Sequence, residues 1–347
     1  MRRVPILVVA VLVTMVLTAV ALKIRSGAAR RARTVELAPL HRPGIVSAKV
    51  PGNGFGQGPP PPTSNVPAGA RTLHGDGRRT DRAAGRVPRD TPVVAWAYDI
   101  GGPIEGQVST SMDEQTLYVA SLNGTLTALS SRDGGVKWTL ELGDRAYPTP
   151  SVADDGTIYV GRDAKRFLAV SPDGKVKWFI DVDGDAYTTP AIVDSGDVVF
   201  AAGATVYEVT PRGDVRWRFQ AKRKVFTAPA VGQQGSIFFG SQDHHAYALT
   251  PDGRLSWRVD LGADVDGAPA IADDGGVFVG TDGDEVLRLD ADDGHIAWRT
   301  NVGGYVRGPL SVARNGDVLA GVCGPRPRAI RLDGSSGIVR GSIAVQG

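Results

Sequence analysis

TPSVADDGTIYVGRDAKRFLAVSPDGKVKW, residues 149–178, is the stretch that predicts the fold. Its turns, Asp155-Gly156 and Pro172-Asp173-Gly174, are typical of tight turns that need a positive φ at glycine. Between the turns lie short apolar and β-branched runs, which indicate an all-β structure. The runs predict four strands, at Pro150–Ala153, Thr157–Gly161, Phe167–Val170 and Val176–Ile180.

The tryptophans show that this unit is repeated. All six recur at intervals of 42, 40, 39, 40 and 41 residues. They are Trp96, Trp138, Trp178, Trp217, Trp257 and Trp298. A fixed period near 40 residues indicates a repeat array, and four meandering strands in that length make one blade of a β-propeller. A buried tryptophan covers about 200 Å², so we expect each one to fasten its blade to the next.

The tryptophan belongs to the fourth, outer strand of each unit. There the sequence alternates, which predicts one buried and one wet face. Val136, Trp138 and Leu140 are expected to share the buried face, as are Val215, Trp217 and Phe219 in a later unit.

A ladder of prolines marks the first strand, at intervals of 40, 39, 40 and 40 residues. Its members are Pro150, Pro190, Pro229, Pro269 and Pro309, with Val108 in the same place in the first unit. Proline has no N–H to donate, so it belongs on a strand edge. We therefore expect the ladder on the innermost strand, which faces the central channel.

Counting strands predicts an all-β propeller on a seven-bladed plan. Trp96 lies on a lone outer strand, Val93–Ile100, and six complete repeats follow. The last repeat ends at Ile338–Val345, where Arg340 is expected in place of tryptophan. The three missing strands would be completed by the lone strand, which suggests a chain that stops one blade short. The alternative is a six-bladed ring with a spare strand.

The N-terminus predicts a membrane segment at residues 1–22. Arg2 and Arg3 precede an uncharged run, Val4–Leu22, about as long as a membrane-spanning helix. We favour a retained signal-anchor helix over a signal peptide cleaved after Ala19–Ala21, because basic residues follow at once. Those basic residues also favour the opposite orientation by the positive-inside rule. We nevertheless expect the propeller on the extracytoplasmic side, since the layout is that of a targeting signal.

Residues 23–90 read as a disordered, basic, Pro/Gly-rich tether, and residues 91–347 as the propeller. The tether carries 13 Lys/Arg and 4 Asp/Glu, and the propeller 24 and 33. An acidic propeller has no basic footprint for nucleic acid, so no nucleic-acid partner is expected. Pro51–Pro62 is expected to be a disordered or semi-rigid spacer, partly polyproline II, and a PxxP-type docking motif is the alternative. Arg71–Arg86 is expected to lie on the first blade.

The repeat resembles the PQQ-like, or quinoprotein-type, propeller family, including the propeller lipoproteins of outer-membrane assembly. The resemblance rests on the Asp-Gly turn before the outer-strand tryptophan and on Pro-Ala at the inner strand, over about residues 71–347. It implies the fold; for the enzymes of the family it further implies pyrroloquinoline quinone, Ca²⁺, an adjacent cysteine pair and a catalytic aspartate. Cys323 is the only cysteine and no matching aspartate is found, so we disfavour both cofactors.

Other chemistry finds little support in the sequence. Asp181–Asp185 resembles the start of an EF-hand loop, but Ala186 and Ile192 stand where Gly and Glu are required. His244 and His245 are adjacent on a hairpin and are expected to point apart. Cys323 is expected to be a buried thiol. We predict no catalytic residues and no metal site.

One set of residues falls just before the inner-strand prolines. It consists of Tyr147, Tyr187, Phe226, Asp266, Tyr305 and Arg307. Loops at this point of each blade gather at one mouth of the channel, so the side chains are expected to converge there. They either receive a peptide or small ligand or simply pack the hub.

Taken together, the sequence predicts a non-catalytic binding scaffold of the cell envelope. We expect a monomer, attached to the membrane through residues 4–22, whose partner is an envelope protein or peptide. A relative of the quinone-dependent oxidoreductases and a small-molecule sensor domain are the alternatives.

Overall fold

The computed structural model describes residues 78–79 and 94–345. Its strands form six sheets, each of four antiparallel strands in chain order. The prediction of an all-β propeller with six complete four-stranded repeats is therefore confirmed for the described residues.

The strands occupy four positions in each sheet. The first strands are β1 Ser109–Thr110, β5 Ser151–Val152, β9 Ala191–Ile192, β13 Ala230–Val231, β17 Ala270–Ile271 and β21 Ser311–Val312. The second are β2 Thr116–Ser121, β6 Ile158–Arg162, β10 Val198–Ala202, β14 Ile237–Gly240, β18 Val277–Gly280 and β22 Val318–Val322. The third are β3 Thr125–Ser130, β7 Arg166–Val170, β11 Thr205–Val209, β15 His245–Leu249, β19 Glu285–Leu289 and β23 Arg328–Leu332. The fourth are β4 Val136–Glu141, β8 Val176–Asp181, β12 Val215–Gln220, β16 Leu255–Asp260, β20 Ile296–Asn301 and β24 Val339–Ala344.

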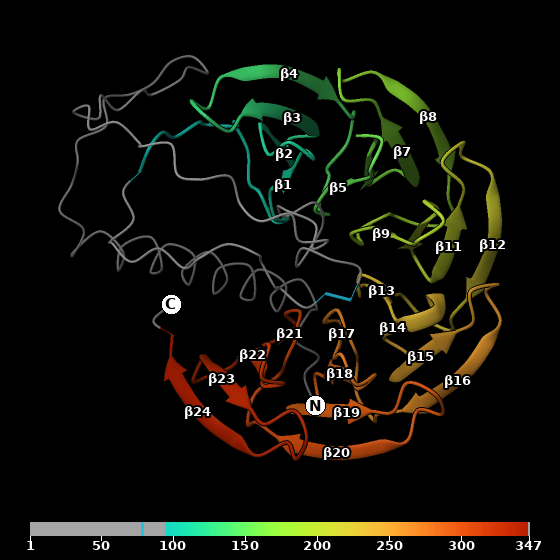
Figure 1. Cartoon of the computed structure of the whole chain (residues 1–347), viewed down its shortest axis with the longest axis vertical. Coiled ribbons are helices and arrows are strands. Elements are labelled where there is room, and N and C mark those ends of the chain that lie inside the picture. The colour runs from blue at the N-terminus through green and yellow to red at the C-terminus, as the bar shows by residue number, and fades with distance from the viewer. Residues whose placement is uncertain (1–77, 80–93, 346–347) are drawn as a thin grey trace, which may run out of the picture. The chain divides into compact units, whose positions relative to one another are not determined.

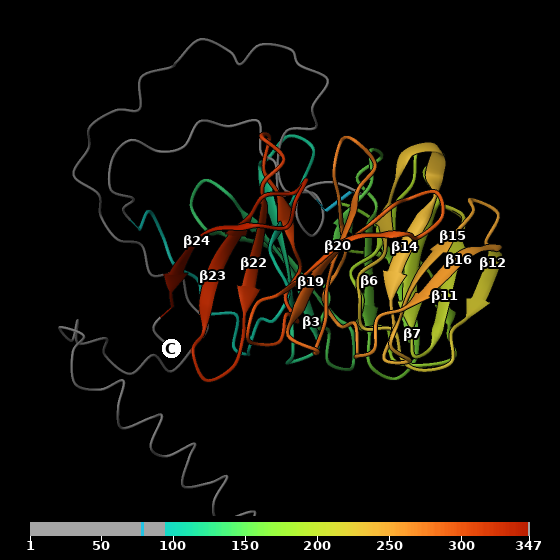
Figure 2. The same ribbon diagram turned by 90° about the horizontal axis from the view of Figure 1, so that it is seen from below.

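The sheets follow one another around an arc, with the first strand of each at the hub and the fourth at the rim (Figure 1). Seen from the side, strands β22 to β24 lie side by side and cross the thickness of the ring (Figure 2). A short 3-10 turn, η2 (Gln233–Gly235), joins β13 to β14. This arrangement is that of consecutive propeller blades.

Each outer strand contains a β-bulge that changes which residues face the neighbouring blade. Leu129 pairs with Val136 and Ala128 with Trp138, so Lys137 is the extra residue. Because the two partners point to opposite faces, Val136 and Trp138 do so too. The prediction that Val136 shares the tryptophan face is wrong; Val136 is 44% exposed, and Val215, before the same bulge, is 48% exposed.

The tryptophans fasten each blade to the next, as predicted. The indole N–H of Trp138 donates to the Pro172 carbonyl oxygen at 2.8 Å, in a turn of the following blade. Its ring lies on Gly174 of the same turn. The same donation runs from Trp178 to Pro211, Trp217 to Pro251, Trp257 to Ala291 and Trp298 to Gly334.

The end of the last repeat differs from prediction. Leu332 pairs with Val339 and Arg331 with Gly341, so Gly341 holds the tryptophan position. Arg340 is the bulge residue instead, and its guanidinium lies 2.8 Å from Asp317. The prediction that Arg340 takes the place of tryptophan is wrong, because Gly341 lies 43 residues after Trp298, a longer interval than any between the tryptophans.

The start of the propeller also differs. Residues 94–100 form no regular strand, so the predicted strand Val93–Ile100 is not found in its described part. The Trp96 indole N–H nevertheless donates to the Ser131 carbonyl oxygen at 3.1 Å. Its ring lies on Gly134, where an added β-carbon would be 2.5 Å away. Trp96 thus makes the contacts of an outer-strand tryptophan.

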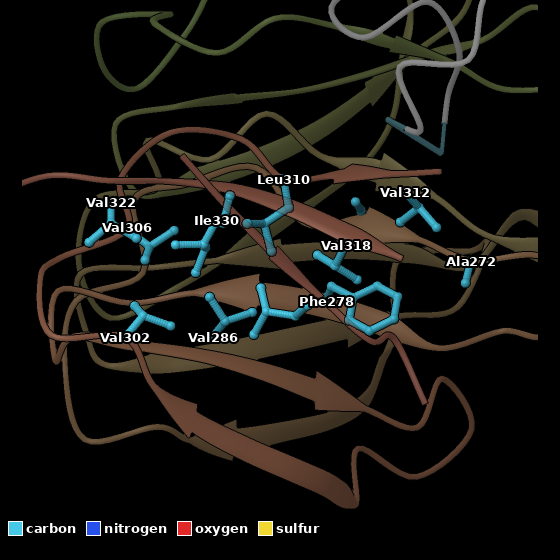
Figure 3. Packing of buried hydrophobic residues seen from close by; sticks show 13 residues of the cluster. Ala272, Phe278, Val286, Val302, Val306, Leu310, Val312, Val318, Val322 and Ile330 are labelled. Atoms are coloured by element: carbon cyan, nitrogen blue, oxygen red, sulfur yellow. The ribbon is translucent and has the colours of Figure 1, made fainter. Parts of the chain in front are cut away.

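The core lies between neighbouring sheets. Figure 3 shows one such layer, where Phe278 and Val286 of the fifth sheet pack against Val318 and Ile330 of the sixth. In β10 every residue is buried, since blades cover both of its faces. In β22 burial alternates, and Leu319 is 45% exposed.

The alternation in the sixth sheet leaves one face uncovered. This open face, lined by Leu319, Gly321, Ala329, Gly341 and Ile343 among others, borders a groove of about 500 Å³. Cys323 follows in the same alternation and is exposed. The prediction of a buried thiol is therefore wrong, because Cys323 falls on the outward side of a strand end whose inward residue is Val322.

Four prolines of the ladder directly precede an inner strand: Pro150, Pro190, Pro229 and Pro269. The fifth does not. Leu310 precedes β21, and Pro309 lies one residue earlier. The extra residue separates Pro309 from the ladder position, which corrects the alignment of the last unit.

The membrane segment at residues 4–22 lies outside the described residues. In the described ranges, no helix has the length and apolarity needed to cross a membrane. Of the tether, the structure describes Arg78 and Arg79. They contact the inner strands of the third to fifth blades. The expectation that this part of Arg71–Arg86 lies on the first blade is therefore wrong.

Candidate functional site

The predicted mouth residues lie in the loops that lead from an outer strand to the next inner strand. In each of these loops, one residue donates its backbone N–H to a carbonyl oxygen at or after the end of the second strand of the preceding blade. Ala146 donates to Ser121 O in this way, and Val306 to Thr281 O, so these two residues hold equivalent positions. Directly after such a residue come Tyr147, Tyr187, Phe226, Asp266 and Arg307. Tyr305 lies two residues earlier, so it is not equivalent to the other five.

Close backbone packing holds these loops in place. A β-carbon on Gly161 at the second strand would be 2.4 Å from the Ala186 carbonyl oxygen, so only glycine fits there. The Thr188 hydroxyl donates to Ala201 O at 3.0 Å and accepts from Ala201 N–H at 2.8 Å. Ala186 and Thr188, on either side of Tyr187, are thus held in place. Tyr187 therefore lies on a rigid loop.

Three aromatic rings from consecutive loops touch one another. The centroids of Tyr147 and Tyr187 are 5.0 Å apart in an edge-to-face arrangement, and those of Tyr187 and Phe226 are 5.7 Å apart and stacked. All three rings are half-buried. We call Tyr147, Tyr187 and Phe226 the aromatic arc. Such geometry is favourable between rings, and it leaves apolar surface open to solvent.

Cations lie at both ends of the aromatic arc. The Arg145 guanidinium is 5.7 Å from the Tyr147 centroid, and the Lys224 ammonium is 5.6 Å from that of Phe226. Arg145 also pairs with buried Asp163 at 3.0 Å. Burial raises the pKa of Asp163, although Arg145 acts in the opposite direction.

The Tyr187 hydroxyl donates to Asp185 at 3.1 Å. Burial is the main reason why the pKa of Tyr187 rises to about 12, and the bond to Asp185 adds to it. Tyr187 is therefore a neutral hydroxyl at physiological pH. It offers polar recognition beside its apolar ring, not a base or a nucleophile.

The remaining predicted residues form a second, charged group. Arg307 binds Asp282 through Nε at 2.9 Å and Nη2 at 2.6 Å, and its guanidinium lies 4.8 Å from the Tyr305 ring centroid. Burial, followed by the charge of Asp282, raises the pKa of Asp266. The Asp266 Oδ1 atom is buried and has no hydrogen-bond partner in the described part of the chain. Contacts therefore join Tyr147, Tyr187 and Phe226 in one group and Tyr305 and Arg307 in another, and Asp266 interacts with Arg307 through its charge.

The sequence did not indicate Arg145, Asp163 or Asp282. Each lies in or beside a mouth loop, but its role depends on a partner some 18 to 25 residues away. A basic residue stands two positions before an aromatic mouth residue in two loops, at Arg145 before Tyr147 and at Lys224 before Phe226. This spacing could have indicated the cations beside the rings.

The acidic run Asp181–Asp185 does not converge on a common point. Asp181 pairs with Arg166 at 3.0 Å, Asp183 accepts from the Tyr207 hydroxyl at 2.6 Å, and Asp185 binds Tyr187. His244 pairs with Asp264 at 3.2 Å. Across residues 78–79 and 94–345, no three His, Cys, Asp or Glu side chains are grouped as metal ligands would be.

The donor set does not fit the quinone site that the resemblance implies. That site uses two adjacent cysteines, and Cys323 is the single cysteine of the chain. At the mouth, Asp282 is already engaged by Arg307.

Comparisons with known proteins agree with the architecture. The family model described as outer membrane protein assembly factor BamB matches residues 81–204 and 202–347. The crystal structure of BamB from Moraxella catarrhalis is similar with a TM-score of 0.59 and 13% identity, over 69% of this chain and 75% of that one. A protein of unknown function from Bacteroides caccae aligns with a TM-score of 0.44 and 18% identity, over 64% of this chain and 90% of that one. A search of curated proteins found no match.

Proposed function

Because this chain belongs to the PQQ-like repeat family described as outer membrane protein assembly factor BamB, we propose that it is a non-catalytic scaffold that binds a protein or peptide of the cell envelope. The aromatic arc carries this proposal. Rigid, half-exposed aromatic rings provide apolar area at a low entropic cost and are enriched at the centres of binding sites.

The charged group next to the arc supports binding rather than catalysis. Arg307 and Asp282 neutralise each other, and Tyr187 keeps its proton at physiological pH. Such groups fix the orientation of a partner by hydrogen bonding. A quinone and Ca²⁺ have no place in this proposal. Turnover of any member of an alcohol panel by the purified chain with added quinone and Ca²⁺ would overturn it.

Capture of a partner tests the role of the mouth. We expect Tyr187→Ala and Tyr305→Ala to reduce the amount of the partner that is crosslinked to the wild-type chain in native envelope and identified by mass spectrometry. Phe179→Ala is the matched control, since Phe179 is a 50% exposed aromatic residue on outer strand β8. Unchanged capture by both tyrosine variants would show that these rings only pack the hub.

Envelope localisation is part of the proposal. It is supported by the apolar run Val4–Leu22 behind Arg2 and Arg3, with the propeller on the extracytoplasmic side. We expect external protease to digest the propeller in spheroplasts whose inner membrane is intact. A propeller that is protected until the membrane is lysed would contradict this orientation.

We also propose that the ring follows a seven-bladed plan, with the segment around Trp96 in the outer position of the seventh blade. Trp96 makes the contacts of the ladder without belonging to any of the six sheets. The open face of the sixth sheet is the face that the other blades bury against their neighbours.

A graft tests the seven-bladed plan. A copy of residues 268–290, which contain β17 to β19, is appended after Gly347. We expect a higher melting temperature and slower labelling of Cys323 by a thiol reagent. A copy with Phe278 and Leu287 replaced by serine is the control. A graft that changes neither reading would favour a six-bladed ring with a spare segment.

A further inference from the structure

Arg79 is held at the hub of the propeller. Its side chain is fully buried, which is rare for arginine. Its φ is 60°, a left-handed conformation that costs a non-glycine residue energy and persists where the surroundings impose it. The preceding residue is bound as well: the Arg78 carbonyl oxygen accepts from the Ile271 N–H of β17 at 3.0 Å. The dipeptide thus lies on the inner strands in the manner of a bound peptide.

Backbone carbonyl groups receive the Arg79 guanidinium. Its Nε donates to Pro229 O at 3.2 Å, and its Nη2 lies 3.1 Å from Pro229 O, 3.1 Å from Pro190 O and 3.2 Å from Thr189 O. Guanidinium has five N–H donors and no acceptor. Proline supplies a carbonyl oxygen without an N–H, so Pro190 and Pro229 each offer an acceptor and no backbone donor.

The repeats themselves explain why the site lies at this blade. In the first two blades, the hydroxyl of a serine on the inner strand donates to the carbonyl oxygen of the ladder proline in the next blade. Ser109 donates to Pro150 O, and Ser151 donates to Pro190 O at 2.8 Å. The equivalent residue of the third blade is Ala191, which has no hydroxyl to offer Pro229 O. Arg79 supplies the donor there.

We propose that the carbonyl oxygens of Thr189, Pro190 and Pro229 form a guanidinium-binding site, which the chain fills with its own Arg79 and which accepts an arginine side chain of another peptide when Arg79 is removed. The planar fork of arginine matches several acceptors at once, whereas the lysine ammonium is a point charge. The ligand class is therefore an arginine-containing extended peptide.

The site lies close to the aromatic arc in the chain. Thr189 and Pro190 follow Tyr187 by two and three residues, and Pro229 follows Phe226 by three. An arginine seated at the carbonyls would thus bring the rest of its peptide near the mouth loops. The proposal does not rest on the proposed function, because the contacts of Arg79 alone carry it.

Peptide binding to the full chain tests the site. The probe is acetyl-Gly-Arg-Gly-amide, and its control is the same peptide with citrulline, which is neutral and nearly isosteric with arginine. By calorimetry we expect Arg79→Ala to bind the arginine peptide at least about tenfold more tightly than the wild type does, and about tenfold more tightly than it binds the citrulline peptide. Arg78→Ala, which removes an arginine paired with Asp273 at the surface, should behave as the wild type.

Folded Arg79→Ala that binds the arginine peptide no better than the wild type, or that binds both peptides equally, would overturn the proposal. If Arg79→Ala does not fold, Ala191→Ser provides the test. The new serine hydroxyl would compete with the Arg79 guanidinium for Pro229 O, since the equivalent Ser151 hydroxyl donates to Pro190 O. We then expect the Ile271 amide, which donates to Arg78 O, to exchange hydrogen about tenfold faster. Ala230→Ser is the control, and equal exchange in both variants would also overturn the proposal.

Discussion

The Trp138 ring rests on Gly174 so closely that a β-carbon on this glycine would lie 2.7 Å from it. Gly174 also has a φ of +82°. One residue thus meets two requirements: the turn needs a left-handed conformation, and the neighbouring blade needs space for its tryptophan. The same pairing recurs from blade to blade, at Gly213 under Trp178 and at Gly253 under Trp217.

We predict that Gly174→Ala destabilises the propeller more than Gly275→Ala does. Both glycines have φ above 80°, so each substitution costs about 1–2 kcal/mol for the left-handed backbone. Only Gly174 adds the steric clash with tryptophan, which costs a further ~1–3 kcal/mol, because nothing lies within 4 Å of a β-carbon at Gly275. Urea unfolding measures both losses. Equal losses of unfolding free energy in the two variants would show that the Trp138 indole moves aside for the added methyl group at no cost.

Trp96→Phe and Trp138→Phe should lower the free energy of unfolding by similar amounts, about 1 kcal/mol. Each change keeps an aromatic ring but removes an indole N–H bonded to a carbonyl of the next turn. The comparison asks whether the segment around Trp96 is an integral part of the ring. A loss in Trp138→Phe without one in Trp96→Phe, measured by urea unfolding, would mean that it is not.

Glu208 should make stability depend on pH. Burial, then a hydrogen bond with Asp197, raises its pKa from the usual 4.5 to about 7, while the charge of Arg216 opposes the shift. A carboxyl group with a higher pKa in the folded chain favours folding below its unfolded pKa. That contribution is lost as the pH rises from about 4.5 to about 7.

Glu208→Gln removes this titration. We expect urea unfolding of the wild type to show a loss of stability between pH 4.5 and pH 7 that is smaller in Glu208→Gln. At pH 8 the variant should be at least as stable as the wild type. Parallel pH profiles for the two proteins would place the pH dependence in other groups.

Arg340→Ala should cost about 1–2 kcal/mol of unfolding free energy, since it removes a charged hydrogen bond from Asp317. The Asp317 side chain is only 3% exposed, and the pair spans 2.8 Å. Arg254→Ala is the control: its pair with Asp252 is exposed on both sides and should contribute less than ~0.5 kcal/mol. Thermal unfolding of the two variants checks the difference, and similar losses would show that the pair of Arg340 with Asp317 contributes no more than an exposed ion pair.

Much of the fold could be predicted because it follows from local sequence patterns. The period of the tryptophans predicted the blades, and Asp-Gly turns predicted positive φ, as at Gly156 with φ +80°. The candidate site could be predicted only in part. Equivalent loop positions brought Tyr147, Tyr187 and Phe226 together, but the partner of Arg307 is Asp282, on a loop 25 residues away.

The sequence by itself determined the strands, their order and the ladder of tryptophans, since these follow from side-chain periodicity and turn chemistry. Tertiary structure decided what depends on register and on distant partners. A single bulge residue turns Val136 away from Trp138, and the pairing of Arg331 with Gly341 puts Gly341, not Arg340, at the ladder position. The fold also brings Arg79 to carbonyl groups more than 100 residues away. No local pattern encodes such a contact, because it exists only once the inner strands of neighbouring blades surround the hub.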